Sequence, residues 1–278
     1  MQSTPEAQSS DSTAPDFSAV LNVLRMCAFA VRKAVFEASA WSIAGTRAHQ
    51  YRVDLVADAV AVDCLTRSGM DVLSEESGHH GGAAGMTVVV DPVDGTNNAI
   101  RGLPWFATSL CAVDAGGAVA SVVLDLTSGT LYDAIRGQGA RANGVPLATS
   151  SCEHVADAFV GTSGAPERAV PWSSTRSIGS IALALCYVAA GSLDGFVDFD
   201  TDVHGVWDYA GALLICHESG AHSTETFGRP LMALRHEARC SPIVAGTESL
   251  LADLQRFRTG SVRGDPHGDG RSTSLRND

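Results

Sequence analysis

Residues 88–97, Val-Val-Val-Asp-Pro-Val-Asp-Gly-Thr-Asn, constrain the fold of this chain more than any other segment. The run of β-branched residues predicts a buried strand. Asp91 and Asp94 stand at its C-terminal edge, where Pro92 and Gly95 bend the backbone so that both carboxylates can face one point. The residues after Gly95 suit the start of a short helix. Pro-x-Asp-Gly is also a common turn sequence, but two carboxylates beside free backbone N–H groups predict a site where a hard cation and a phosphate meet.

Three further acidic segments could contribute to the same site. Glu75 follows an apolar pair, and its alternative is a solvated loop. Asp208 precedes a helix that reads as mostly buried, and its alternative is an ordinary helix cap. Asp54 and Asp58 belong to an apolar amphipathic stretch, where their alternative is a solvent-facing position on a helix.

Three motifs occur in a fixed order: Glu-Glu-Ser at 75–77, Asp-Pro-Val-Asp-Gly-Thr-Asn-Asn at 91–98 and Trp-Asp-Tyr-Ala-Gly-Ala at 207–212. This combination resembles the inositol monophosphatase family of Mg²⁺-dependent, lithium-sensitive phosphatases of small phosphorylated metabolites. The resemblance covers roughly residues 17–257. It implies an α/β fold, a layered αβαβα sandwich of the sugar phosphatase type, with two or three Mg²⁺ ions as cofactor and a homodimer as the assembly.

The resemblance also implies a set of metal ligands. Glu75, Asp91 and the backbone carbonyl of Val93 would hold the first Mg²⁺ ion, and Glu75 would also be a catalytic residue. Asp94 and Asp208 would hold the second ion, with Asp91 bridging the two. Mg²⁺ prefers carboxylate oxygens, and four converging carboxylates would repel one another without cations.

In the family a threonine that matches Thr96 orients and deprotonates the attacking water, assisted by an aspartate from the preceding helix. Asp58 is the expected partner because Ala57-Asp58 resembles the family segment, and Asp54 competes with it. The backbone N–H groups of Gly95 and Thr96 would bind the phosphate. The resemblance thus predicts a phosphoric monoester hydrolase that uses metal-activated water.

The substrate is less defined by the sequence. Gly179 and Ser180 resemble the small residues that open a helix beside the substrate, and Asp198 is the expected acidic ligand of a substrate hydroxyl. An inositol phosphate-like compound, histidinol phosphate, a sugar phosphate and a nucleotide 3′-phosphate remain alternatives. A catalytically silent binding or regulatory protein on the same fold is the competing class, and the presence of all four expected carboxylates argues against it.

The histidines predict no metal site of their own. His79 and His80 lie in a Gly-rich segment that reads as a solvated loop, and His204 and His217 read as packing or surface residues.

Bulk properties limit the partners. The formal net charge of −12 argues against nucleic-acid binding. No apolar run reaches the length of a membrane span, and the N-terminus lacks the pattern of a signal peptide. The seven scattered cysteines are typical of reduced thiols. These features predict a cytoplasmic protein whose partner is a small phosphorylated metabolite rather than a membrane.

The predicted organisation has four parts. Residues 1–15 and 259–278 are polar and predicted to be disordered. Residues 16–150 form an N-terminal α+β lobe that carries the metal site, with an antiparallel sheet, and residues 151–258 form a C-terminal α/β lobe. The expected helices are 17–39, 53–67, 178–190, 206–219 and 248–257, and the expected strands are 86–90, 105–113, 118–126, 130–135, 158–161, 195–199 and 242–245.

Overall fold

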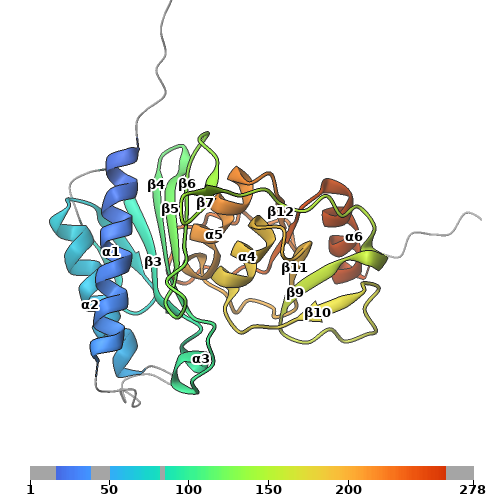
Figure 1. Cartoon of the computed structure of the whole chain (residues 1–278), viewed down its shortest axis with the longest axis horizontal. Coiled ribbons are helices and arrows are strands. Elements are labelled where there is room, and N and C mark those ends of the chain that lie inside the picture. The colour runs from blue at the N-terminus through green and yellow to red at the C-terminus, as the bar shows by residue number, and fades with distance from the viewer. Residues whose placement is uncertain (1–16, 39–50, 82–84, 261–278) are drawn as a thin grey trace, which may run out of the picture.

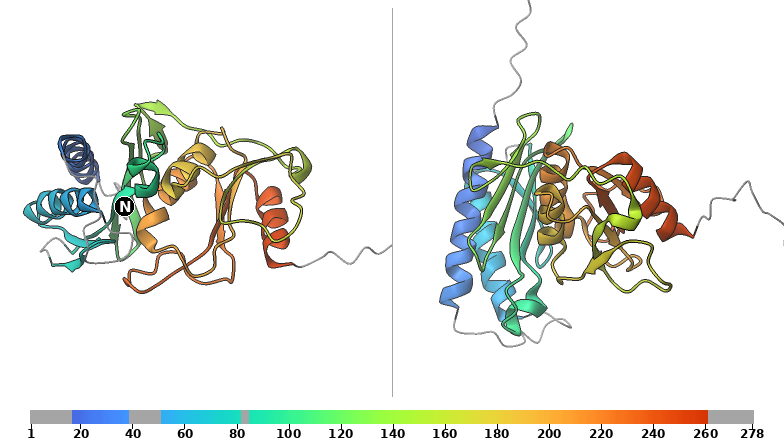
Figure 2. Two further views of the ribbon diagram at one scale, coloured as in Figure 1. Left: turned by 90° about the horizontal axis from the view of Figure 1, so that it is seen from below. Right: turned by 45° about the vertical axis from the view of Figure 1, so that its right-hand side comes forward.

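A computed structural model describes residues 17–38, 51–81 and 85–260 (Figure 1). Helices and sheets alternate in five layers, which the left view of Figure 2 shows edge-on. The predicted αβαβα sandwich is confirmed. The two segments predicted to be disordered lie outside the described residues, except that Thr259 and Gly260 complete the last helix. No helix in the described parts of the chain combines the length and the hydropathy needed to cross a membrane.

The first layer consists of α1 (Ser18–Glu37) and α2 (Arg52–Arg67). Their apolar residues recur at helical spacing, so each helix has one buried stripe. Both stripes pack on one face of the first sheet and form a cluster with its outward-facing valines.

The first sheet has eight strands in the order β2-β1-β3-β4-β5-β6-β7-β8. Every neighbouring pair is antiparallel, as predicted, except β1 and β3, which run parallel. The segment before Glu75 was not predicted as a strand, and His79 and His80 lie on β2 rather than in a loop. The short helix α3 (Thr96–Ile100) follows β3. The strands are β1 (Asp71–Ser74), β2 (Gly78–His80), β3 (Thr87–Asp94), β4 (Ala107–Asp114), β5 (Gly117–Asp125), β6 (Leu131–Ile135), β7 (Ala140–Ala142) and β8 (Val145–Pro146).

The third layer consists of α4 (Ile181–Ala189) and α5 (Val206–Glu218), which lie between the two sheets (Figure 1). Nearly every residue of both helices is buried, and one apolar cluster joins them to both sheets. A helix that is apolar all round needs such a fully enclosed position. The second half of the chain therefore covers one face of the first sheet, and α1 and α2 cover the other.

The second sheet is mixed, with the order β10-β9-β11-β13-β12. The last helix, α6 (Glu248–Thr259), covers its outer face through Leu250 and Leu254. A 3₁₀ turn, η1 (Val155–Asp157), precedes the sheet. The strands are β9 (Phe159–Ser163), β10 (Ser174–Arg176), β11 (Gly195–Asp198), β12 (His222–Glu225) and β13 (Pro242–Ala245).

Candidate metal centre and phosphate site

Asp91 and Asp94 line the same cavity because β3 is irregular between them. In a regular strand, residues three apart point to opposite faces of the sheet. Here Asp91 lies opposite Ser109 and Asp94 opposite Ala107, so three steps on β3 match two steps on β4. The extra residue resets the alternation, as in a β-bulge. The spacing of the two acids thus brings their carboxylates together.

Glu75 reaches this point through the parallel pairing of β1 with β3. Ser74 is in register with Val90, and the backbone N–H of Glu75 donates to the Val90 carbonyl at 3.1 Å. Glu75 therefore lies next to Asp91 at the carboxyl ends of two parallel strands. The solvated-loop alternative for Glu75 is wrong, because a four-residue strand that the sequence pattern did not reveal carries it into the site.

Asp208 enters from the other side, in the first turn of α5. One of its oxygens, Oδ2, accepts a hydrogen bond from the Gly205 backbone N–H at 2.6 Å, so Asp208 does cap the helix. The same carboxylate meets Glu75 and Asp91, and ligand atoms of these three residues all lie within 4.8 Å of one another. The cap and the cluster are compatible because a carboxylate has two oxygens.

Burial and mutual repulsion make this cluster costly to ionise. Burial, followed by repulsion from Asp208, raises the pKa of Glu75 well above its usual value. Burial and the neighbouring Glu75 do the same to the pKa of Asp91. The pKa of Asp94 rises to about 7 for the same reasons, although Ser180 Oγ donates to Asp94 at 2.5 Å. A positive charge placed among these groups would reverse their pKa shifts.

The donor set fits Mg²⁺. Four carboxylates and the backbone of Val93 line one cavity of about 250 Å³, which also leaves room for waters. Mg²⁺ binds hard oxygen ligands and usually keeps several waters. All the residues named as metal ligands from the sequence therefore meet at one cavity: Glu75, Asp91, Val93, Asp94 and Asp208.

Thr96 contacts Asp54, which corrects the expectation that Asp58 is its partner. Thr96 Oγ1 lies 3.1 Å from Asp54 Oδ1 and 2.8 Å from the Val93 carbonyl oxygen. Asp58 instead accepts a hydrogen bond from Ser74 Oγ, one helical turn further along α2. Burial raises the pKa of Asp54 to about 6. Both aspartates are buried on the same face of α2, but only the first turn of the helix reaches the start of α3.

Gly95 has a conformation that its position requires. Its φ of 90° lies in the left-handed region, and an added Cβ would lie 2.7 Å from the carbonyl oxygen of Trp105. α3 begins directly after it, and Asn98 Nδ2 ties this helix to the Ile178 carbonyl at 2.6 Å. Gly95 and Thr96 line the cavity of the acidic cluster.

A second cavity of about 190 Å³ adjoins the first and shares Asp94, Gly179 and Asp208 with it. Ser180 caps α4, because its Oγ accepts from the Leu183 backbone N–H while it donates to Asp94. Of the two small residues predicted beside the substrate, Gly179 lines both cavities and Ser180 lines the second. The remaining lining residues are Thr162, Ser163, Ser177, Ser180, Ile181, Phe196 and His204.

Asp198 does not line this cavity, which corrects its predicted contact with a substrate hydroxyl. Its side chain is completely buried at the end of β11, and burial raises its pKa to about 7. His204 stands between Asp198 and Asp208, with its ring 3.6 Å from a carboxylate oxygen of each. Burial alone would lower the pKa of His204, but the surrounding carboxylates raise it to about 9. His204 is therefore a largely buried residue that lines the second cavity, rather than a surface residue.

Sequence reasoning also missed a contact that supports the acidic cluster from outside. His236 Nε2 donates to the backbone carbonyl of Glu75 at 2.9 Å. The His236 ring packs on Trp207 with 4.8 Å between centroids, and the guanidinium of Arg239 lies 5.0 Å from the Trp207 ring centre. Because His236 and Glu75 are 161 residues apart, no local pattern could have paired them.

Comparisons with known proteins agree with this geometry. A sequence profile of the Inositol monophosphatase family matches residues 26–258. Nus factor SuhB of Salmonella typhimurium is 36% identical over 222 residues, which cover 73% of this chain and 81% of that protein. A fructose-1,6-bisphosphatase/inositol-1-monophosphatase of Methanothermobacter thermautotrophicus is 34% identical over 222 residues, or 71% and 79% of the two chains. The crystal structure of extragenic suppressor protein suhB from Bartonella henselae superposes with a TM-score of 0.74 and 27% identity, and covers 88% of this chain and all of that one.

Proposed function

This chain belongs to the inositol monophosphatase family and is a phosphatase of phosphate monoesters, and from that premise we propose that it hydrolyses a small phosphorylated metabolite with the help of Mg²⁺. The observation that carries the proposal is the convergence of four acidic residues on a single cavity, which Val93 also lines. Divalent cations bind carboxylate oxygens and would offset the mutual repulsion of these buried acids.

Each ligand has a proposed place. Glu75, Asp91 and the Val93 carbonyl would hold one ion, and Asp91, Asp94 and Asp208 would hold a second. When bound, the ions acidify a water molecule and neutralise charge on the phosphate.

The proton from the attacking water has a defined route through the chain. The Thr96 hydroxyl has one proton, which it can give to Asp54 or to the Val93 carbonyl. When the hydroxyl donates to Asp54, a lone pair of Thr96 Oγ1 is free to accept a hydrogen bond from the water, and a proton of the water can move to Thr96 as the Thr96 proton moves to Asp54. Asp54, whose burial raises its pKa to about 6, is the terminal acceptor. General-base assistance of this kind contributes about 10²–10⁴-fold to a rate.

The two adjoining cavities separate the phosphate from the rest of the substrate. We propose that the backbone N–H groups of Gly95 and Thr96 bind phosphate oxygens beside the acidic cluster. The leaving group then occupies the second cavity, against Gly179, Ser180 and His204. A space of about 190 Å³ with hydroxyl and imidazole groups in its wall suits a small polar leaving group.

A substrate panel tests the proposal. Inositol phosphate, histidinol phosphate, fructose 1,6-bisphosphate and a nucleotide 3′-phosphate are each offered to the full chain, and release of inorganic phosphate is measured with Mg²⁺ and with EDTA. We expect release from at least one substrate, its loss in EDTA and its return with Mg²⁺. Full turnover in EDTA after removal of tightly bound ions would contradict the mechanism. Asp91→Asn is the matched inactive control.

One observation favours a second role, namely the name Nus factor of a relative that is 36% identical. A regulatory protein on the same fold would keep its regulatory effect in the Asp91→Asn variant, in which hydrolysis is lost. A protein that acts only through hydrolysis would lose that effect.

We further propose a cytoplasmic homodimer that lithium inhibits at millimolar concentration. Sedimentation at micromolar concentration tests the dimer, and a phosphate-release assay with lithium tests the inhibition.

A further inference from the structure

A second cluster of metal-ligating side chains lies on the far side of His204 from the acidic centre. Asp198, Asp200 and His204 each offer a ligand atom, and these atoms all lie within 4.8 Å of one another. We propose that these three residues form a separate binding site for a divalent transition-metal ion, for which Zn²⁺ is the best match. The assignment concerns binding alone, so it stands or falls independently of the phosphatase reaction.

The buried carboxylate of Asp198 is the first reason. Its side chain is completely inaccessible to solvent. Oδ1 accepts a hydrogen bond from the Asp200 backbone N–H at 2.9 Å, but Oδ2 has no hydrogen-bond partner among the described residues. A buried oxygen without a partner is costly, and a buried carboxylate more so. A cation bound to the Asp198 carboxylate would compensate the buried charge that the protein leaves only partly hydrogen-bonded.

The spacing of the three side chains is the second reason. His204 Nε2 lies 3.6 Å from Asp198 Oδ1 and 3.6 Å from Asp200 Oδ2. Hydrogen bonds between such atoms are shorter, at about 2.7–3.2 Å. Ligand atoms bonded at about 2.1 Å to a tetrahedral ion lie about 3.4 Å apart. The observed separations of the three ligand atoms are therefore close to the edges of a coordination shell, although Ser163 Oγ also hydrogen-bonds two of these atoms.

A fourth donor completes the arrangement. Ser163 Oγ lies 2.9 Å from Asp200 Oδ2 and 3.2 Å from His204 Nε2, at the end of β9. Ser163 and His204 both line the second cavity. An ion held here would fix the wall of that cavity and leave one coordination position for Ser163 or for a water.

The choice of ion follows from the donors. The acidic centre offers only oxygens, which suit Mg²⁺, whereas this cluster includes an imidazole nitrogen, which suits Zn²⁺ and its neighbours. The other ring nitrogen of His204, Nδ1, faces Asp208 Oδ2 at 3.6 Å. Histidines that ligate metals usually donate a hydrogen bond from their second nitrogen to a carboxylate, and Asp208 is placed on that side of His204, although at a longer distance. The two sites would therefore be adjacent and linked through the contact between His204 and Asp208.

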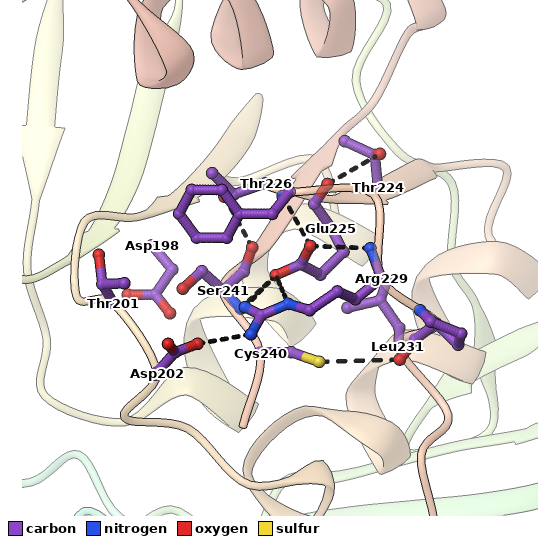
Figure 3. Close-up of polar contacts among 12 residues, drawn as sticks. Asp198, Thr201, Asp202, Thr224, Glu225, Thr226, Arg229, Leu231, Cys240 and Ser241 are labelled. Carbon is purple, nitrogen blue, oxygen red and sulfur yellow. Dashed lines mark hydrogen bonds and ion pairs between the residues drawn. The ribbon is translucent and has the colours of Figure 1, made fainter. Parts of the chain in front are cut away.

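The loop that carries the cluster is held in place from the second sheet (Figure 3). Arg229 bridges Asp202 and the buried Glu225, with 2.6 Å between the paired atoms on each side. Ser241 Oγ donates to the backbone carbonyl of Asp200 at 2.7 Å. A rigid scaffold lowers the cost of assembling ligands around an ion, so the site is preorganised.

Metal content tests the site directly. The full chain is stripped with EDTA and then dialysed against Zn²⁺ in a large excess of Mg²⁺, which keeps the all-oxygen centre filled with Mg²⁺. Retained zinc is measured by mass spectrometry, and Co²⁺ absorption in the visible range reports a nitrogen-containing site of low coordination number. The variants are His204→Gln and Asp200→Asn. The controls are Asp157→Asn, an exposed acid in η1 outside the cluster, and Asp91→Asn in the acidic centre.

We expect about one zinc per chain in the unchanged protein and in both controls. Changes to residues that only support metal ligands typically weaken metal binding by about 10–100-fold. Because His204→Gln and Asp200→Asn remove ligands themselves, they should weaken zinc binding by more than that. Absence of retained zinc in the unchanged chain would overturn the proposal. A zinc content in both cluster variants equal to that of the unchanged chain, or a loss of zinc in Asp91→Asn alone, would also overturn it. If the cluster variants do not fold, thermal unfolding of the unchanged chain in Mg²⁺ decides. Its midpoint should rise on addition of Zn²⁺, and a constant midpoint would overturn the proposal.

Discussion

Raising the pH should destabilise the metal-free protein, because burial has raised the pKa values of several carboxylates. Asp94 has a pKa of about 7 in the folded state against 3.8 in its ordinary environment. Between these values the folded state binds more protons than the unfolded state. The corresponding stability is fully present below about pH 4 and is lost as the pH rises through about 7.

The magnitude follows from the size of the shift. About three pKa units correspond to about 4 kcal/mol, which is the upper limit for Asp94 alone. Burial also raises the pKa of Asp198 to about 7 and that of Asp54 to about 6, and both contributions have the same sign. The pKa of His204 is raised to about 9, so its contribution to the stability of the folded state is also lost as the pH rises, but at higher pH. Water entry and local relaxation reduce such penalties, so we expect a total loss of about 2–4 kcal/mol.

The assay is urea unfolding followed by circular dichroism at a series of pH values from about 5 to about 8, in EDTA and in Mg²⁺. In EDTA the free energy of unfolding should fall with pH. In Mg²⁺ it should stay level or rise, because the ions bind ionised carboxylates and stabilise the folded state. Asp94→Asn should flatten the decline in EDTA, whereas Asp202→Asn, an exposed acid, should not. Equal unfolding free energies across this range in EDTA would refute the reasoning.

Three further predictions concern single residues. Asp208→Asn should abolish turnover and raise the Mg²⁺ concentration needed, and unchanged values of both would leave Asp208 as a helix cap only. Thr96→Ala should lower kcat by about 10²–10⁴-fold with little change in Mg²⁺ affinity, whereas Asp58→Asn should act mainly on stability. Steady-state kinetics in which Asp58→Asn lowers kcat and Thr96→Ala does not would restore Asp58 as the proton acceptor. Arg229→Met should leave the buried charge of Glu225 uncompensated and cost about 3 kcal/mol in urea unfolding; a cost near zero would mean that backbone N–H groups alone hold the Glu225 carboxylate.

Much of the fold could be predicted because its signals are local. The helical stripe on residues 17–39 and the hairpin signals between 113 and 131 each report the period of one element, and both elements formed as predicted. The strands β1, β10 and β12 are among those that were missed, since β10 and β12 contain no apolar residue and β1 contains only two. The loss of β1 mattered most, because its parallel pairing with β3 places Glu75 beside Asp91.

The sequence by itself determined the layered fold and the chemistry of the acidic centre. A β-branched run, two acids three residues apart and a glycine in the left-handed region are enough to form a carboxylate pair beside a helix start. Only the tertiary structure decided which more distant residues reach that point. Asp54 and Asp58 share one face of α2, and about 6 Å along the helix axis separates them. The position of α3 against α2 selects Asp54, and helical periodicity contains no information about that position. In the same way, packing between layers buried Asp198 and aligned His204 with carboxylates on both sides.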